Sequence, residues 1–90
     1  MRYEIKPSLK RIIDKLKKKS PEMFKAIYNK IEEIVNSKNP DRYKPLRAPM
    51  QNKKRVHIMK SFVLVFEYDK KNDVINFLDF DHHDNVYKKI

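Results

Sequence analysis

The 90-residue sequence contains no cysteine, no glycine and no tryptophan. Without cysteine, the chain has neither disulfide bonds nor thiolate ligands for a metal. No apolar run approaches the roughly 20 residues that a membrane-spanning helix needs, and the N-terminal stretch MRYEIKPSLK has no apolar signal segment. We therefore expect one soluble domain over residues 1–90, located in the cytoplasm and not bound to a membrane.

Acidic residues are also few, since 12 Asp and Glu stand against 22 Lys and Arg and leave a formal net charge of +10. Basic side chains concentrate in residues 6–19 and 38–60, whereas residues 67–90 carry more acids than bases. Such an excess favours a polyanionic partner, which could be nucleic acid, an acidic protein or a membrane surface. The alternative is a lysine-rich surface that serves solubility alone, but segregation into two blocks disfavours it.

Hydrophobic periodicity predicts a strand followed by two helices in the first half of the chain. Tyr3 and Ile5 alternate with charged neighbours and indicate a strand over residues 2–6. Pro7 opens a helix, and Ser20 is expected to be the N-cap of a second helix that begins at Pro21. Because almost no loop separates the two helices, they should form an antiparallel hairpin packed on one sheet face.

Three strands are expected in the second half, after an irregular segment over residues 36–52 in which Tyr43 and Leu46 pack against the domain. These strands are predicted at residues 53–59, 62–68 and 74–80. In the absence of glycine, Asn and Asp should supply the left-handed positions of the hairpin at residues 69–73. The predicted fold is therefore α+β: β-α-α-β-β-β, with the helix hairpin on one face of a mainly antiparallel four-stranded sheet and a short C-terminal turn or helix.

The stretch KKRVHIMKSFVLVFEYD, residues 53–69, combines a cationic strand with a buried one. In the first strand, Val56 and Ile58 alternate with Arg55 and His57, so the two pairs point to opposite faces. The second strand is apolar on both faces, which is typical of a strand that is covered on both sides. We therefore expect Arg55 and His57 on an open sheet face, opposite the helices.

Five nitrogen-bearing side chains fall within eight residues of this stretch: Lys53, Lys54, Arg55, His57 and Lys60. Clustered cations suit a phosphate group, because they donate charge-assisted hydrogen bonds to its oxygens. The alternative is an edge strand whose charges prevent aggregation. The cations alone do not decide between these interpretations.

A second polar cluster lies near the C-terminus: Asp79, Asp81, His82, His83 and Asp84. Three interpretations apply, namely a metal site, a helix N-cap supplied by Asp81 or Asp84, and acid–base chemistry by one histidine. Adjacent ligands on an extended segment point in opposite directions, and the spacing matches no familiar metal motif. We therefore expect neither a metal nor another cofactor. Tyr87 either packs or, in a basic cleft, stacks on a nucleobase or orients a phosphate.

The order of these elements, together with LRAPMQNKKRVHIMKSFVLVFEYD (residues 46–69) and FDHHDNVY (residues 80–87), resembles the RelE/ParE superfamily of toxins from type II toxin–antitoxin systems. The resemblance covers essentially the whole chain and is nearest to the RelE branch. It implies a metal-independent RNase that cuts messenger RNA in the ribosomal A site, by attack of a ribose 2′-hydroxyl on the adjacent phosphate. It also implies an acidic, RelB-like antitoxin that forms a hetero-oligomer with the toxin, while the free toxin is a monomer.

Carried over by position, the lysines of the family's basic strand fall on Arg55 and His57. The family's terminal Tyr falls on Tyr87, and the Arg that commonly precedes it by four residues falls on His83. By this resemblance, Arg55, His57, His83 and Tyr87 are the catalytic candidates. The residues expected to bind RNA phosphates are Lys53, Lys54, Lys60 and Arg47, and those expected to support the catalytic groups are His82 and Asp84.

The sequence departs from the family pattern at two points. The family's Arg in the central strand falls on Val63, and Met59-Lys60-Ser61 stands where a glycine-containing turn is common. An alternative function follows from the first departure: a ParE-like topoisomerase inhibitor, or a degenerate module that binds nucleic acid or antitoxin without cleaving RNA.

Overall fold

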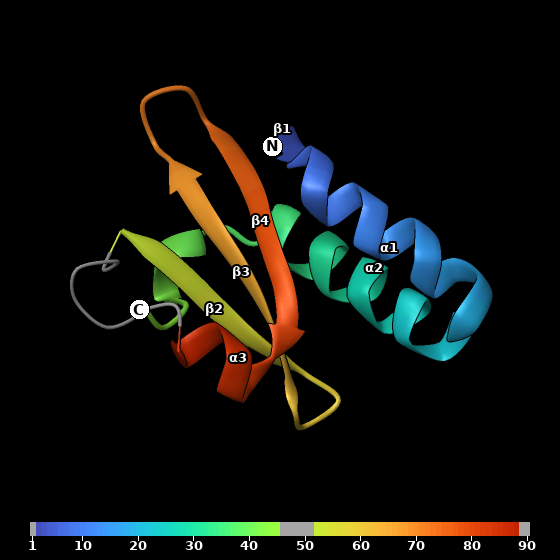
Figure 1. Cartoon of the computed structure of the whole chain (residues 1–90). Helices are drawn as coiled ribbons and strands as arrows, with labels where there is room; N and C mark the ends of the chain where they lie inside the picture. Colours follow the sequence, from blue (N-terminus) through green and yellow to red (C-terminus); the bar gives the residue numbers. More distant parts are fainter. Residues whose placement is uncertain (1, 46–51, 89–90) are drawn as a thin grey trace.

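The computed structural model of the protein describes residues 2–45 and 52–88, apart from the side chains of Asp41, Tyr87 and Lys88. Its elements are β1 (Arg2–Ile5), α1 (Pro7–Lys19), α2 (Pro21–Val35), a short 3₁₀ helix η1 (Pro40–Arg42), β2 (Lys53–Ile58), β3 (Phe62–Asp69), β4 (Val74–His82) and α3 (His83–Lys88) (Figure 1). The predicted α+β fold and its β-α-α-β-β-β order are confirmed. Leu46 and Arg47, to which the sequence assigns packing and phosphate binding, lie outside the described residues.

The four strands form one sheet in the order β1-β4-β3-β2. β2, β3 and β4 are antiparallel neighbours, and β1 adds to the outer edge of β4 in parallel. β4 continues to His82, two residues beyond its predicted end, because Asp81 and His82 still pair with Val63 and Phe62. The polar residues after Phe80 suggested that the strand ends there, but their pairing with β3 extends it.

The two long helices cover one face of the sheet, and Figure 1 shows them running side by side. Ser20 joins them through its backbone alone: its N–H donates to the Leu16 carbonyl oxygen at 2.8 Å, and its own carbonyl oxygen accepts the Phe24 N–H at 3.0 Å. Ser20 is the N-cap of α2, as predicted, but its side chain makes no capping hydrogen bond. Its ψ of 79° lies outside the extended region that an N-cap residue normally adopts, because the residue must also end α1.

The main core lies between the helix hairpin and the sheet. Its fully buried side chains come from both helices and from the two inner strands, and they include Leu9, Ile13, Ile27, Ile31, Ile34, Leu64, Phe66, Ile75 and Phe77. Tyr43 packs edge-on against Phe66 with ring centroids 5.5 Å apart, which confirms its predicted role as a packing anchor. Among the described residues, no helix combines the length and the apolar character that crossing a membrane would demand.

A smaller apolar cluster lies on the opposite face of the sheet. Val63 and Val65 of β3 are 0% and 4% exposed, because Val86 of α3 packs over them together with Leu78 of β4. Leu78 takes part because the β3–β4 register shifts at a bulge, where Val65 pairs with Asp79 but Phe66 pairs with Phe77. β3 is thus covered on both faces, as predicted, and α3 lies on the side away from α1 and α2.

The turn between β2 and β3 has an unfavourable backbone conformation. Met59 and Lys60 have φ values of 51° and 68°, in the left-handed region that glycine would occupy at no cost. In the β3–β4 hairpin the left-handed residue is Asp73, with φ of 54°, and Asp tolerates this region better than most residues. Asn72 instead donates two hydrogen bonds to the Asp69 carboxylate, and these bonds lower the pKa of Asp69.

Replacing Lys60 by glycine should stabilise the fold. Relief of a left-handed non-glycine residue is worth about 1–2 kcal/mol, and the greater entropy of the unfolded chain removes up to about 1 kcal/mol of that gain. We expect Lys60→Gly to raise the free energy of unfolding by about 0.5–1 kcal/mol in urea denaturation. Lys71→Gly, in an exposed turn without positive φ, is the matched control and should lower the stability. Equal losses of stability in the two variants would show that Lys60 is not in a strained conformation.

Shortening Val86 should loosen α3. We expect Val86→Ala to reduce the free energy of unfolding by about 2 kcal/mol, because buried methyl groups are lost and a cavity remains. Amide exchange of residues 83–86 should accelerate, while that of α1 stays protected. Val35→Ala, a partly buried residue that packs against the core on the other sheet face, is the control: it should lower stability without selectively releasing α3. Unchanged exchange in α3 of the Val86 variant would show that the helix is held by other contacts.

Candidate functional site

β2 presents Arg55 and His57 on the sheet face that α3 partly covers. Two rows of paired residues cross the sheet from β2 through β3 to β4. The first row is Arg55, Val65 and Asp79, and the second is His57, Val63 and Asp81. The central valines lie under Val86. Since neighbouring strands are about 4.8 Å apart, Arg55 and His57 border one side of this apolar cluster, and His57 is exposed.

The other cations of this segment do not all share that face. Side chains alternate along a strand, so Lys53 lies on the side of Arg55 and His57. Lys54 lies on the side of Val56 and Ile58, which belong to the core beneath the helix hairpin. Lys60 is exposed in the turn that follows β2. The structure therefore groups Lys53 with Arg55 and His57, and it separates Lys54 from them.

The outer edge of β2 is partly paired. The Arg55 N–H donates to the Lys44 carbonyl oxygen at 3.0 Å, and Pro45 forms a bridge with Lys54. A strand edge covered in this way has less need of charges to prevent aggregation. This pairing weakens the edge-protection interpretation of the cations and leaves phosphate binding as the stronger one.

His83 is fixed at the end of the sheet where β2 turns into β3. Its backbone N–H donates to the Ser61 carbonyl oxygen at 2.8 Å, and its Nδ1 lies 3.1 Å from the same oxygen. A carbonyl oxygen only accepts hydrogen bonds, so Nδ1 carries the hydrogen. The other ring nitrogen, Nε2, lies 3.0 Å from Asp84 Oδ1. His83 is thereby brought beside the turn that carries Lys60 and follows His57.

His82 caps α3, whereas the sequence analysis considered Asp81 or Asp84 for this role. Its Nδ1 accepts the Asp84 N–H at 3.2 Å. Asp81 cannot occupy the N-cap because it still belongs to β4, where its Oδ1 accepts the His82 N–H at 2.7 Å and an Asn85 amide hydrogen at 3.2 Å. Asp84 lies in the first turn of α3, where the helix dipole favours a negative charge.

His82 and His83 do not point in opposite directions, although an extended chain over these residues would separate their side chains. The chain changes from strand to helix between them, and their rings stack with centroids 4.6 Å apart. The His82 ring also meets Phe62 edge-on at 5.7 Å. Tyr87 follows His83 by one helical turn, but its side chain lies outside the described part of the structure.

Sequence reasoning missed the residues that hold His83 in place. The contact to His83 is made by the Ser61 backbone carbonyl, and a backbone atom gives no signal in the sequence. The same holds for the Lys44 carbonyl, which accepts the N–H of Arg55 in β2. Val86 could have been found, because an apolar residue inside a polar terminal segment indicates a packed turn.

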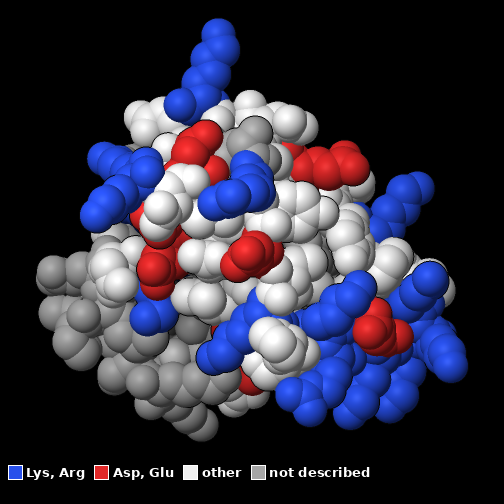
Figure 2. All heavy atoms as spheres, turned by 90° about the horizontal axis from the view of Figure 1, so that it is seen from above, with Lys and Arg blue, Asp and Glu red and all other residues white. Residues whose placement is uncertain are grey.

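Basic charge also gathers far from this site. Figure 2 shows Lys and Arg side chains crowded at its lower right, on the side where Figure 1 places the turn between α1 and α2. This location agrees with the three lysines in the last turn of α1, Lys17, Lys18 and Lys19. Of the two basic blocks in the sequence, only the second borders His83.

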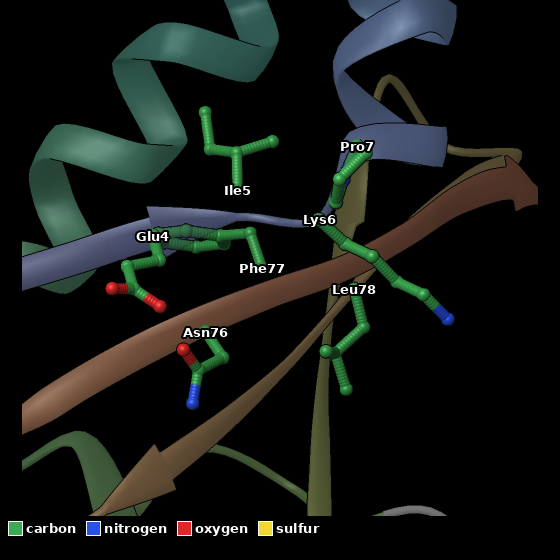
Figure 3. A pocket seen from close by; sticks show the side chains of 7 residues that line it. All are labelled: Glu4, Ile5, Lys6, Pro7, Asn76, Phe77 and Leu78. Atoms are coloured by element: carbon green, nitrogen blue, oxygen red, sulfur yellow. The ribbon is translucent and has the colours of Figure 1, made fainter.

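A pocket of about 240 Å³ lies at the opposite edge of the sheet, where β1 meets β4 and α1 begins (Figure 3). Its lining residues are Glu4, Ile5, Lys6, Pro7, Asn76, Phe77 and Leu78. It contains none of the predicted site residues and is smaller than most small-molecule sites, which have about 300–1,000 Å³. The candidate site lies elsewhere, on the sheet face beside α3.

Comparison with known proteins agrees with this architecture. The family model described as the ParE toxin of the type II toxin–antitoxin system parDE matches residues 3–87. A Methanocaldococcus jannaschii protein named as a candidate toxin, RelE4, is 56% identical over 86 residues, which cover 96% of this chain and 89% of that protein.

Solved structures show the same fold. A chain of the Mycobacterium tuberculosis RelBE2 toxin–antitoxin complex superimposes with a TM-score of 0.71 at 20% identity, covering 90% of this chain and 95% of that one. YafQ from Escherichia coli BL21(DE3) gives a TM-score of 0.69 at 16% identity, covering 97% and 99%. The near-complete family match and the close archaeal relative lead to one conclusion: this chain belongs to the ParE toxin family, within the RelE/ParE superfamily of type II toxin–antitoxin systems.

Proposed function

We propose that this toxin inhibits translation by cutting messenger RNA on the ribosome, without a metal in the reaction. The observation that carries the proposal is the fixed orientation of His83. Its Nδ1–H is bound to the Ser61 carbonyl, so the ring atom proposed to exchange a proton with RNA is Nε2, which lies 3.0 Å from Asp84 Oδ1. His83 lies at the end of the sheet where β2 turns into β3, and His57 and Lys60 lie at the same end.

The reaction needs few groups. The ribose 2′-oxygen forms a bond to phosphorus while the bond from phosphorus to the 5′-oxygen breaks. A base takes the 2′-hydroxyl proton, and an acid protonates the leaving 5′-oxygen, so that a 2′,3′-cyclic phosphate and a 5′-hydroxyl result. A positioned acid or base contributes about 10²–10⁴-fold in rate, and cations stabilise the charge that develops on the phosphate oxygens.

The chain offers candidates for each role. His57 and His83 are the proton carriers, with Tyr87 as the alternative acid. Arg55 holds the scissile phosphate, because its guanidinium can bind two phosphate oxygens at once. Lys53 and Lys60 neutralise neighbouring phosphates. Asp84 and His82 support the orientation of the His83 ring through the contacts described above.

An acidic antitoxin is the proposed partner, and it would form a hetero-oligomer with a toxin that is otherwise monomeric. The net charge of +10 favours association with an acidic protein. The similarity to a chain from a toxin–antitoxin complex supports the same proposal.

Replacing His83 by asparagine tests whether its ring takes part in RNA cleavage without unfolding the chain. We expect His83→Asn to lower cleavage of messenger RNA by translating ribosomes at least about 10²-fold, measured by primer extension. Asn has an amide N–H that can bind Ser61 but no counterpart of Nε2, so α3 should stay docked. Arg55→Ala should lose activity as well, whereas Lys71→Ala, on the distant hairpin, should not. Intact messages with the wild-type chain would overturn the proposal.

The two neighbouring lysines of β2 test which face binds RNA. Lys53→Ala should weaken RNA binding and reduce the slope of log Kd against log salt by about 1, since one phosphate contact is lost. Lys54→Ala should change both quantities less, because its side chain lies on the other face. Affinities measured between 50 and 200 mM salt check this, and equal effects of the two substitutions would show that RNA does not lie along the Arg55 face.

A second candidate function is inhibition of a topoisomerase. Val63, completely buried under Val86, stands where the RelE resemblance expects an Arg, and the matching family model is that of ParE. A chain that blocks supercoiling by DNA gyrase in vitro and leaves ribosome-bound messages intact would have this function instead.

A further inference from the structure

The end of β4 and the start of α3 bring three metal-ligating side chains together. One ligand atom from each of His82, His83 and Asp84 lies within 4.8 Å of the other two. We propose that these residues bind a divalent transition-metal ion, with Zn²⁺ as the preferred ion. Imidazole and carboxylate are both ligands that zinc accepts.

The spacing of the ligand atoms fits a tetrahedral site. With metal–ligand bonds of about 2.0–2.1 Å, ligand atoms in such a site are about 3.3 Å apart. His83 Nε2 lies 3.0 Å from Asp84 Oδ1, and His82 Nδ1 lies 3.7 Å from Asp84 Oδ2. The two distances involve different oxygens of the carboxylate, and one ligand atom from each of the three residues lies within 4.8 Å of the other two. Side-chain rotations that bring one Asp84 oxygen toward both rings would therefore complete the geometry.

The hydrogen bond from His83 to Ser61 prepares the ring for a metal. Metal-binding histidines commonly donate their second ring N–H to a backbone carbonyl, which fixes the tautomer and the ring orientation. Here Nδ1 donates to the Ser61 oxygen at 3.1 Å. In the neutral ring, Nε2 then directs a lone pair at a carboxylate oxygen, an arrangement that a cation between the two atoms would stabilise.

His82 is also in the tautomer that a metal requires at Nδ1. That atom accepts the Asp84 N–H at 3.2 Å, so it carries a lone pair that is already directed toward Asp84. The metal would replace this hydrogen bond. The side chains of the two histidines are each 38% exposed and that of Asp84 is 65% exposed, which leaves access for the ion and for a water molecule as fourth ligand.

The local charge favours a cation despite the basic chain. Residues 79–84 contain Asp79, Asp81 and Asp84 but neither Lys nor Arg. The ligands of a bound ion would therefore come from an acidic segment, although the turn that carries Lys60 lies next to His83.

Metal binding would affect cleavage, and this step rests on the proposed function. The ion would occupy Nε2 of His83, the atom proposed to exchange a proton with RNA. Zinc should therefore inhibit the toxin reversibly, and EDTA should restore it.

Titration of the tag-free chain with ZnCl₂ tests the site by calorimetry and thermal shift. We expect one Zn²⁺ per chain and a higher Tm, because a ligand that binds only the folded state stabilises it. Mg²⁺ should have no effect, because it prefers oxygen ligands. His82→Ala and Asp84→Asn should weaken Zn²⁺ binding at least tenfold. His57→Ala, which removes the histidine outside the cluster, should bind as tightly as the wild-type chain.

Circular dichroism shows whether each variant is folded, and Asp84→Asn, at an exposed position, remains informative if His82→Ala is not. The proposed zinc site would be rejected if all variants bound Zn²⁺ equally well. It would also be rejected if the wild-type chain bound no Zn²⁺ at 100 μM, about ten times the concentration of the chain. Zinc binding by a wild-type chain that never cleaves RNA would leave the site intact and reject only the nuclease. Cleavage that persists with zinc bound would reject the inhibition alone.

Discussion

The candidate site depends on how a six-residue helix is held against the sheet. An isolated helix of that length is unstable in water, because nucleation costs more than so few hydrogen bonds return. Two contacts join α3 to the strand β3 and to the turn before it. The Ser61 carbonyl accepts both N–H groups of His83, and Val86 is buried over Val63 and Val65. These two contacts help to fix the orientation of His83, together with its contacts to His82 and Asp84.

This attachment explains the valine in the central strand. An Arg at position 63 would place a charge under α3, whereas Val63 gives the helix an apolar surface to pack on. The chain thus has a buried contact at a position where the RelE pattern has a cation. In the proposed site the positive charge comes instead from β2 and its turn, and proton transfer comes from histidines that α3 and β2 hold in place.

Most of the fold followed from the periodicity of apolar residues. The alternation at Val56 and Ile58 correctly placed one face of β2 on the core, and the helical spacing after Pro7 and Pro21 gave α1 and α2 their correct starts. Tyr43 was identified as an anchor because an aromatic residue in a polar loop usually packs. Each of these signals is carried by a side chain whose burial dominates the local free energy.

The candidate site was less predictable, because backbone hydrogen bonds and the change from strand to helix position its side chains. The polar residues Asp81 and His82 gave no sign that β4 continues, since their pairing with β3 is made by backbone atoms. The argument that His82 and His83 diverge assumed an extended chain and failed where the strand becomes a helix. Lys54 was grouped with Arg55 by proximity in sequence, although strand alternation separates their side chains. The unfavourable φ angles of Met59 and Lys60 were equally hidden, because nothing in those side chains favours a left-handed conformation.

The position of β4 within the sheet has a consequence for synthesis of the chain. β1 is made first, yet its partner in the sheet is β4, and Arg2 pairs with Val74. A chain growing from its N-terminus can form the helix hairpin early, but it cannot close the sheet before residues 74–82 have left the ribosomal exit tunnel. The residues of α3 are made later still. The candidate site therefore assembles late, because α3 follows β4 in the chain and must also leave the tunnel before His83 can dock on Ser61.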